Sequence, residues 1–331
     1  MNCMGDDMMQ QYQIEKKIPS DVKTVLILGH IRPDGDSVGS CLGLYHYLKD
    51  NVPSLEIEIC LQKFADSFNM LPGAENVCRM EAMDMNRKFD LCISCDASDR
   101  ERLGEAVVLF DRAEHTICID HHITNPGFGD WNYVRGELSS CAETLGELFT
   151  PAKISTDCAK CLYLGIVHDT GVFKYSNTTL QTMAFAGLLI EKGINHTQII
   201  DRTYFARTAA QTRICGRAMS RMKTADHGRI TYSVVTLADM RECGAGITDL
   251  NGIVEQLRIV EHAETAVFIY ELEPGCYKVS LRSNNVVDVS KIASSYGGGG
   301  HEKAAGFDIH MSCDSLIEQL LKAIKEELPA V

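Results

Sequence analysis

A short polar turn early in the chain carries side chains that could bind a metal ion. His30, Asp34 and Asp36 stand within seven residues, directly after the apolar run 24–28. We expect this run to form a buried strand that ends at Gly29, with an apolar-periodic helix after the turn. Mixed nitrogen and oxygen ligands suit a borderline divalent ion such as manganese better than calcium. The turn therefore predicts a metal site at the carboxyl end of a strand, where α/β proteins place their sites.

The residues between these side chains bear on the shape of the turn. Pro33 is expected to hold Arg32 in an extended conformation, and Gly35 lets the chain turn tightly, so that alternate carboxylates converge. An alternative interpretation gives the carboxylates no role beyond the turn, with Asp36 or Ser37 as the helix cap. Both interpretations fit the turn taken by itself.

Further candidate side chains stand at the ends of two later apolar runs and of one helical pattern. They are Asp96, Asp120, His121, His122 and Asp169. Because the carboxyl ends of parallel strands open on one edge of a sheet, we expect Asp96 and His121 to share a cavity with the turn. Carboxylates crowded into one crevice repel each other and raise their pKa values unless cations are present. This excess of negative charge predicts a pair of metal ions.

A tract of four glycines, Gly297–Gly300, is a second candidate site. Consecutive glycines can turn several N–H groups toward one point and form a concavity that binds phosphate. His301 adds a donor, and Arg282, at the end of an expected hairpin strand, could clamp a phosphate with two hydrogen bonds. The alternatives are a flexible loop for the tract and a solvated strand end for Arg282.

The composition describes a soluble protein of two domains. The chain has 331 residues, more than one comfortable core, and 45% of them are hydrophobic. No segment approaches the roughly 20 apolar residues of a membrane span, and the N-terminus lacks the apolar stretch of a secretion signal. Fourteen cysteines are scattered rather than placed at framework spacings. This use of cysteine favours a reducing cytoplasm.

Two C-x-x-C pairs raise zinc binding or redox chemistry as alternatives. Cys92 and Cys95 lie in an apparent strand, where residues three apart point to opposite faces, and Cys158 and Cys161 lie in a helical pattern without a partner pair. We therefore expect all four to be buried as small hydrophobic side chains.

The net charge limits the partners of the protein. At −13 the chain repels polyanions, and no basic run stands out. Long duplex nucleic acid is therefore not an expected partner, whereas a small phosphorylated ligand held by a few local cations fits this charge.

Apolar runs and helical patterns alternate in the first two thirds of the chain. Strands are expected at 24–28, 55–62, 89–96 and 115–120, and helices at 141–149, 156–168 and 179–192. Ser140 and Glu143 fit a capping box at the first of these helices. The alternation predicts a doubly wound α/β domain with a parallel sheet.

A different pattern begins at Arg229. It contains a strand at 230–235, a helix at 248–258, a hairpin at 265–272 and 276–283, and a closing helix at 314–327. This order is typical of a smaller α+β domain. We assign residues 1–204 to the first domain, 205–222 to a helical linker and 223–331 to the second domain.

Five motifs of the chain resemble those of one known family. The first four are HIRPDGDS (30–37), CISCDASD (92–99), DHH (120–122) and GIVHDTGVF (165–173). In order and spacing they resemble the four motifs of the DHH phosphoesterases. The fifth, GGGGHEKAAGF (297–307), resembles the signature of the substrate-binding domain in the DHH-associated subfamily. The resemblance covers the chain from about residue 22 to residue 307.

The resemblance implies manganese-dependent hydrolysis of phosphoester bonds in very short nucleotides. The substrate class comprises nanoRNA, pApA or cyclic di-AMP, and 3′-phosphoadenosine 5′-phosphate. Two Mn²⁺ ions are implied, with Mg²⁺ or Co²⁺ as alternatives, and two such ions can activate a hydroxide for attack on phosphorus. The ligands implied are His30, Asp34 and Asp96 for one ion, and Asp36, Asp96, His121 and Asp169 for the other.

Roles for the remaining candidates follow from the same resemblance. Asp120 is expected to orient a histidine ring, and His122 to contact the scissile phosphate or protonate the leaving oxygen. The resemblance makes residues 1–204 the catalytic domain and residues 223–331 the substrate-binding domain, with the catalytic cleft between the two domains. The substrate-binding residues implied are Arg282, Gly298, Gly299 and His301.

Two other functions compete with this one. The same metal centre would serve an inorganic pyrophosphatase or polyphosphatase, although those relatives carry a different second domain without the GGGGH sequence. A catalytically silent regulator that binds cyclic dinucleotides is the other alternative, and the presence of every proposed ligand argues against it. We expect a cytoplasmic protein without membrane contact, and a homodimer from the frequency of dimers among soluble proteins.

Overall fold

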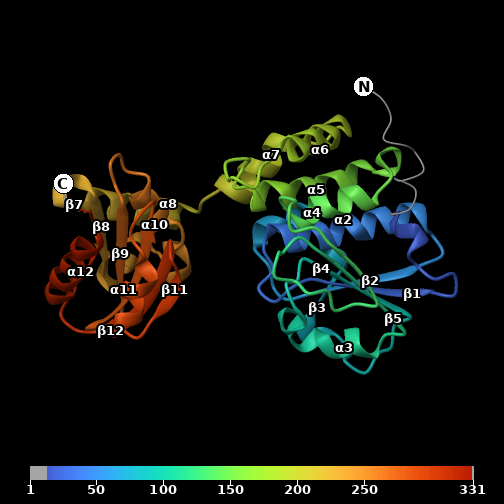
Figure 1. The fold of residues 1–331 in the computed structure, drawn as a ribbon, viewed down its shortest axis with the longest axis horizontal. Helices are drawn as coiled ribbons and strands as arrows, with labels where there is room; N and C mark the ends of the chain where they lie inside the picture. Colours follow the sequence, from blue (N-terminus) through green and yellow to red (C-terminus); the bar gives the residue numbers. More distant parts are fainter. Residues whose placement is uncertain (1–12, 330–331) are drawn as a thin grey trace. The chain divides into compact units, whose positions relative to one another are not determined.

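The computed structural model of this chain describes residues 13–329. The chain divides into two compact units, one ending at Ala206 and the other beginning at Arg207 (Figure 1). None of the helices in residues 13–329 has both the length and the apolar character that a membrane span requires.

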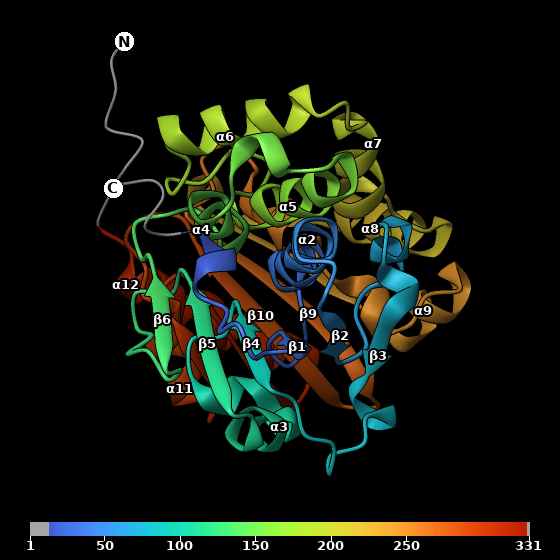
Figure 2. The same cartoon turned by 90° about the vertical axis from the view of Figure 1, so that its right-hand side faces the viewer.

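The first unit is built on a six-stranded sheet. Its strands run in the order β3-β2-β1-β4-β5-β6, side by side in Figure 2, and all five pairings are parallel. Their bounds are Thr24–Leu28 (β1), Glu56–Leu61 (β2), Val77–Arg79 (β3), Leu91–Cys95 (β4), His115–Asp120 (β5) and Trp131–Val134 (β6). The predicted doubly wound domain with a parallel sheet is therefore confirmed.

Helices cover both faces of this sheet, with α2, α4 and α5 on one face and α3 on the other, and α6 and α7 outside α5 (Figure 1). Their bounds are Gly35–Asn51 (α2), Val107–Arg112 (α3), Cys141–Leu148 (α4), Thr156–Asp169 (α5), Leu180–Glu191 (α6) and His196–Ile200 (α7). Shorter turns of 3-10 helix span Ile14–Lys16, Asp66–Met70, Ala74–Asn76, Met80–Ala82, Arg100–Ala106 and Pro151–Lys153, and a π turn spans Asp201–Phe205.

The packing of α2 against α5 needs a glycine. A Cβ atom on Gly39 would lie 2.5 Å from the carbonyl oxygen of Cys161, far inside normal contact. The two backbones therefore approach closely and hold the beginning of α2 against the end of α5.

The capping box predicted for α4 forms only in part. The Ser140 hydroxyl accepts a hydrogen bond from the Glu143 N–H at 3.0 Å, as expected of an N-cap. The Glu143 carboxylate does not return to Ser140 but accepts from the Ser139 N–H at 3.0 Å and from the Thr182 hydroxyl at 2.9 Å. The predicted hydrogen bond from the Ser140 N–H to the Glu143 side chain was therefore wrong, because the Glu143 carboxylate accepts from Ser139 and Thr182 instead.

The four cysteines of the C-x-x-C pairs are buried with free thiols, as predicted. Cys95 packs into the core beneath α2 and α5, whereas Cys92 packs into the core on the opposite face of the sheet. The strand thus separates the two thiols, and this pair cannot close around a common ion.

The second unit is a mixed sheet with helices on both faces. Its strands run in the order β11-β12-β10-β9-β8-β7, and of their pairings only β8 with β9 is parallel. Their bounds are Lys223–Ala225 (β7), Ile230–Val235 (β8), Thr265–Glu273 (β9), Cys276–Ser283 (β10), Gly299–His301 (β11) and Ala304–His310 (β12). The predicted α+β character is confirmed.

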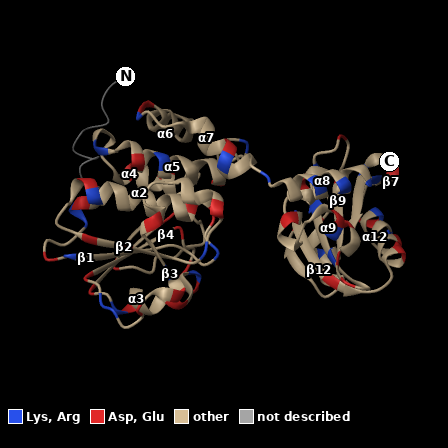
Figure 3. Ribbon diagram, turned by 180° about the vertical axis from the view of Figure 1, so that it is seen from behind, with Lys and Arg blue, Asp and Glu red and all other residues tan. Residues whose placement is uncertain are grey.

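Two cores hold these helices to the sheet. Helices α11 and α12 share one core with the sheet, and α8, α9 and α10 share the other. The helices are Ala209–Ser220 (α8), Leu237–Cys243 (α9), Ile253–Arg258 (α10), Val289–Ser295 (α11) and Cys313–Glu327 (α12), with 3-10 turns at Asp226–Gly228 and Ile247–Leu250. Lys and Arg residues are interspersed with Asp and Glu along the ribbon in Figure 3.

Two predicted features of this region look different in the structure. The helix expected at 248–258 is interrupted, because Gly252 has a φ of +81° and separates Ile247–Leu250 from α10. Residues 205–222, assigned to a linker, include α8, which buries Ile214 and Ala218 in the second unit.

Candidate metal centre

Asp34 and Asp36 stand on either side of the first residue of α2. Asp34 is the N-cap, and its Oδ1 accepts from the N–H groups of Asp36 at 3.0 Å and Ser37 at 3.1 Å. The capping interpretation of the turn thus had the cap on the wrong residue. Asp36 lies in the first helical turn with its side chain fully buried.

Asp36 owes its orientation to the beginning of α4. Its carboxylate accepts from the N–H groups of Cys141 at 2.6 Å and Ala142 at 3.0 Å, and from the Ser40 hydroxyl at 3.1 Å. Free N–H groups and the helix dipole make such a terminus favourable for an anion. Gly165 leaves room for this arrangement, since a Cβ there would lie 2.5 Å from Asp36 Oδ1.

The loop between β1 and α2 has an unusual backbone. Arg32 has a φ of +56°, so the prediction that Pro33 holds it extended is wrong. Proline disfavours the right-handed helical region for the residue before it. The left-handed conformation of Arg32 lies outside that region. The Arg32 N–H donates to Gln62 Oε1 at 2.9 Å, which fixes this conformation. Strain of this kind is concentrated at functional sites.

Asp96 occupies the centre of the site, directly after β4. Its φ of +59° turns the side chain away from the strand, and only 2% of the residue is exposed. Asp96 Oδ2 lies 3.5 Å from His30 Nε2, and Oδ1 lies 3.6 Å from His121 Nε2. Oδ1 is buried without a hydrogen-bond donor among the described residues. A buried carboxylate oxygen in this state is costly, and a cation would satisfy it.

The two histidines on either side of Asp96 are oriented alike. His30 Nδ1 lies 2.7 Å from the Ile31 carbonyl oxygen, and His121 Nδ1 lies 3.4 Å from the Leu138 carbonyl oxygen. A carbonyl oxygen can only accept, so Nδ1 carries the proton in both rings. In the neutral form of each ring, which a metal ligand requires, Nε2 then carries a lone pair directed at the carboxylates.

The predicted ligands fall into two groups that share Asp96 as a neighbour. In each group the ligand atoms lie within 4.8 Å of one another, and the groups are His30, Asp34 and Asp96, and Asp36, His121 and Asp169. In the second group, His121 Nε2 lies 3.0 Å from Asp169 Oδ2, at the end of α5, and 3.8 Å from Asp36 Oδ2. The structure thus brings all six predicted ligands together.

The charges of the site raise several pKa values. Burial, followed by the nearby charges of Asp96 and Asp169, raises the pKa of Asp36 well above its ordinary value. Burial disfavours the charged form of His30, but hydrogen bonding to Asp34 and Asp96 outweighs it and raises the pKa to about 10. Without a cation, Asp36 and His30 therefore favour their protonated forms, as the crowding of carboxylates predicts. Asp34 differs, because burial opposes its charge but hydrogen bonding to His30 outweighs burial and lowers the pKa to about 2.

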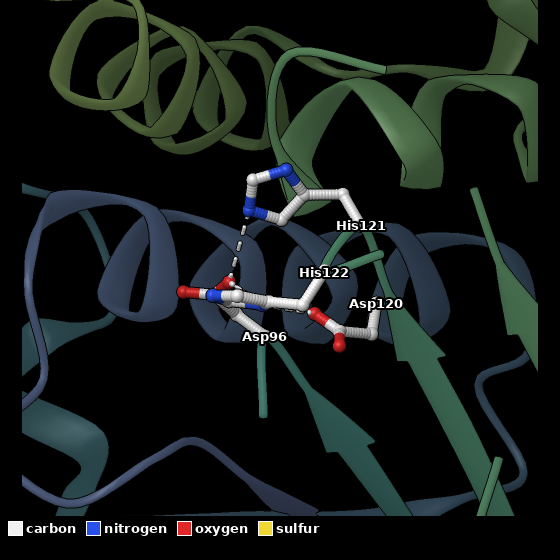
Figure 4. Close-up of side chains that lie close together, drawn as sticks. All are labelled: Asp96, Asp120, His121 and His122. Carbon is white, nitrogen blue, oxygen red and sulfur yellow. Dashed lines mark hydrogen bonds and ion pairs between the residues drawn. The ribbon is translucent and has the colours of Figure 1, made fainter. Parts of the chain in front are cut away.

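Asp120 and His122 form a pair beside this site (Figure 4). Asp120 is fully buried, and its Oδ1 lies 2.8 Å from His122 Nδ1. Hydrogen bonding to Asp120 raises the pKa of His122, whose side chain is 42% exposed. His122 Nδ1 also lies 3.8 Å from Asp96 Oδ1, and Asp96, Asp120, His121 and His122 offer ligand atoms within 4.8 Å of one another.

Sequence reasoning missed two residues of the site. Asn125 donates to Asp120 Oδ2 at 2.7 Å and to the Ala97 carbonyl oxygen at 2.9 Å, and so ties the ends of β4 and β5 together. Arg102 accepts the Ile31 N–H on its carbonyl oxygen at 2.7 Å, and its guanidinium lies 3.1 Å from His30 Nδ1. Neither residue stands at a strand end, which was the signal used to find the others.

The predicted substrate-binding residues lie in the second unit. Arg282 on β10 and His301 on β11 both stand opposite Ala304 of β12, so their side chains project from the same face of the sheet. The Arg282 side chain is partly buried and pairs with Glu255 Oε1 at 2.7 Å. Gly298 has no room for a side chain, since a Cβ would lie 2.3 Å from the Gly306 carbonyl oxygen, whereas Gly299 faces open space.

Comparison with known proteins identifies both units. The DHH family, N-terminal domain, matches residues 24–166, and the DHHA1 domain matches residues 228–329. The bifunctional oligoribonuclease and PAP phosphatase NrnA of Thermus thermophilus is 29% identical over 317 residues, which cover 92% of this chain and 90% of that protein. The Bacillus subtilis protein of the same name is 27% identical over 313 residues, covering 92% and 95%.

One solved structure has a closely similar fold. An exopolyphosphatase-related protein from Bacteroides fragilis superposes with a TM-score of 0.81 at 22% identity over 98% of each chain. The two matched domains and the relatives of similar length confirm the resemblance seen in the motifs. The chain therefore belongs to the DHH family, whose members are metal-dependent phosphoester hydrolases, and it carries a DHHA1 domain after the DHH domain.

Proposed function

We propose that this chain is a manganese-dependent phosphodiesterase and phosphatase for very short nucleotides. The substrates we propose are nanoRNA, pApA or cyclic di-AMP, and 3′-phosphoadenosine 5′-phosphate. The relatives named as oligoribonucleases and PAP phosphatases support the first and last of these. The observation that carries the proposal is the buried carboxylate of Asp96. Its two oxygens face the two groups of candidate ligands, and its Oδ1 has no hydrogen-bond donor among the described residues.

The residues present fit a pair of divalent cations. His30, Asp34 and Asp96 would hold one ion, and Asp36, Asp96, His121 and Asp169 the other, with Asp96 shared. Two cations held in this way lower the pKa of a bound water and neutralise charge on the phosphate oxygens. The nitrogen and oxygen donor set suits manganese, with magnesium or cobalt as alternatives.

His122 is proposed to act on the phosphate or on the leaving oxygen. Asp120 accepts a hydrogen bond from the Nδ1–H group of His122, which orients the ring and leaves its Nε2 side to face the substrate. Asn125 holds Asp120 in turn, so the ring has a fixed orientation before substrate arrives. The raised pKa of His122 favours a protonated ring, which suits a proton donor to a leaving oxygen.

The DHHA1 domain is proposed to bind the substrate through Arg282, Gly298, Gly299 and His301. Arg282 and His301 share a face of the sheet and offer donors for a phosphate, and the open Gly299 lets a ligand approach the backbone. The cleft expected between the domains stays a prediction. The free thiols of all thirteen cysteines in residues 13–329 support a reducing, cytoplasmic location.

The test is a substrate panel with the purified full chain and manganese. It contains di- to pentanucleotides, 3′-phosphoadenosine 5′-phosphate, pApA, cyclic di-AMP and inorganic pyrophosphate, with Asp96→Ala as the inactive control. We expect turnover of the short nucleotides and none of pyrophosphate. Hydrolysis that persists without divalent metal, or that Asp96→Ala leaves intact, would refute the proposal.

A further inference from the structure

A second cluster of metal-ligand side chains lies in the DHHA1 domain, apart from the residues assigned to substrate. Glu273 is the last residue of β9, Cys276 the first of β10 and His310 the last of β12. One oxygen, one sulfur and one nitrogen from these three residues lie within 4.8 Å of one another. Nothing in the phosphoesterase reaction requires this combination.

The strand register places the three side chains on one face of the sheet. Cys276 stands opposite Glu273 on one side and opposite His310 on the other. Residues directly opposite each other in antiparallel strands project to the same face. A shift of register between Cys276 and Tyr277 places Glu273 opposite Cys276. A regular hairpin would have placed Leu272 at that position.

A tight turn fixes the backbone beneath the cluster. Pro274 and Gly275 join β9 to β10, and Gly275 has a φ of +79°, which a side chain would disfavour. The Met311 N–H donates to the Gly275 carbonyl oxygen at 3.2 Å and so attaches the end of β12 to the same turn. The three Cα positions are therefore set before any ligand binds.

The cluster is open on one side and negatively charged. His310 Nε2 lies 3.4 Å from Glu273 Oε1, and these side chains are 74% and 67% exposed. Cys276 lies beneath them with 6% of its surface exposed. These surroundings favour a cation, and the exposed side chains are free to adjust around it.

We propose that Glu273, Cys276 and His310 bind one divalent cation of the zinc class. Thiolate, imidazole and carboxylate are the ligands of tetrahedral Zn²⁺ sites, and water would complete the fourth position. A sulfur ligand distinguishes this site from the metal centre of the first domain, whose candidate ligands are nitrogen and oxygen only. The ion would join the ends of three adjacent strands, and its binding does not depend on the proposed reaction.

The sulfur ligand also provides the test. The full-length protein, first saturated with manganese, is titrated with Co²⁺ and followed by absorption in the near ultraviolet, where cobalt–thiolate charge transfer absorbs. We expect a band that saturates at one cobalt per chain and disappears when zinc is added. Absence of the band from the wild-type protein would overturn the proposal.

Variants assign the band to these residues. Cys276→Ser should abolish it, whereas Cys313→Ser, which removes a partly buried thiol of α12, should leave it unchanged. His310→Gln and Glu273→Gln change exposed side chains, so they should fold normally and weaken cobalt binding. A band that survives Cys276→Ser, or equal affinity in the two glutamine variants and the wild type, would show that the cluster is only an ion pair beside a thiol.

Discussion

The carboxylate of Asp36 accepts a hydrogen bond at 2.6 Å from the N–H of Cys141, more than a hundred residues later in the chain. This contact joins the beginning of α2 to the beginning of α4 beneath the candidate metal centre. The dipole of α4 therefore stabilises a charge that burial and the neighbouring carboxylates oppose. The site is organised by backbone groups before any cation binds.

Asp96→Asn should abolish activity while leaving the protein folded. The amide keeps the shape of the side chain but removes the charge that both ligand groups face. We expect activity to fall by more than about a hundredfold. Mutation of a residue that only supports a metal ligand already lowers metal affinity or activity about 10–100-fold. Asp99→Asn is the matched control, since Asp99 caps the next helical turn and asparagine is also a good cap. Circular dichroism checks that both variants are folded. Equal losses of activity in the two variants would contradict the assignment of Asp96 as a metal ligand.

Asp120→Asn should lower kcat with little effect on KM. An asparagine offers one oxygen, so it cannot accept from both His122 and Asn125 as the carboxylate does. The ring of His122 then loses its fixed tautomer, and we expect kcat to fall about 10–100-fold. Asn125→Ala removes only the outer donor and should have a smaller effect. If manganese affinity fell in parallel with kcat, Asp120 would be acting on the metal ligands instead.

Binding of manganese should release protons at neutral pH. In the metal-free protein the pKa of His30 is raised to about 10 and that of His121 to about 12, so both are protonated at pH 7. A histidine must be neutral to bind a metal, so the affinity should weaken as the pH falls. Calorimetric titration in two buffers of different ionisation heat measures the protons released. No release at pH 7 would mean that these rings are not ligands.

The sequence predicts those parts of the structure that local patterns determine. The strands at Thr24–Leu28, His115–Asp120 and Ile230–Val235 were predicted with the observed bounds, because each is an apolar run with polar or glycine neighbours. The convergence of the site followed from the rule that parallel strand ends open on one edge. That rule needs only the order of elements and the residue at each end.

The remaining features depend on contacts distant in sequence. The short edge strands Val77–Arg79 and Trp131–Val134 were not predicted, since few residues and mixed polarity give no clear period. The left-handed Arg32 depends on Gln62, and the role of Asn125 depends on where β4 and β5 end. Such information exists only once the sheet is assembled.

Glu264 should stabilise the DHHA1 domain in a way that depends on pH. Its Oε1 accepts from the N–H groups of residues 285–287 at 2.6 to 3.1 Å, and the residue is 8% exposed. Although burial opposes the charge, these donors lower its pKa. Glu264→Ala should cost about 2–3 kcal/mol at pH 7, because it leaves N–H groups without an acceptor.

The sign of the pH effect follows from the lowered pKa. The stabilisation by Glu264 is complete above the unfolded pKa of about 4.3 and is lost as the pH falls through the lower folded pKa. The difference between wild type and Glu264→Ala should therefore shrink in acid. Hydrogen exchange, detected by mass spectrometry on peptides from β8 to β10, measures this difference in stability locally. A difference that grew below pH 4 would contradict the charged, hydrogen-bonded state.

Arg282→Lys should separate substrate binding from structural support. Glu255 pairs through one oxygen with Arg282 and through the other with Arg258, both at 2.7 Å. Lysine keeps the charge at 282 but cannot form the two parallel hydrogen bonds of a guanidinium. If Arg282 clamps a phosphate, KM for 3′-phosphoadenosine 5′-phosphate should rise about tenfold at unchanged kcat, roughly the 1.4 kcal/mol of one charged hydrogen bond. Arg258→Lys alters the other ion pair of Glu255, has no proposed substrate contact and should leave KM unchanged. Equal effects in the two variants would assign Arg282 to holding α10 against the sheet.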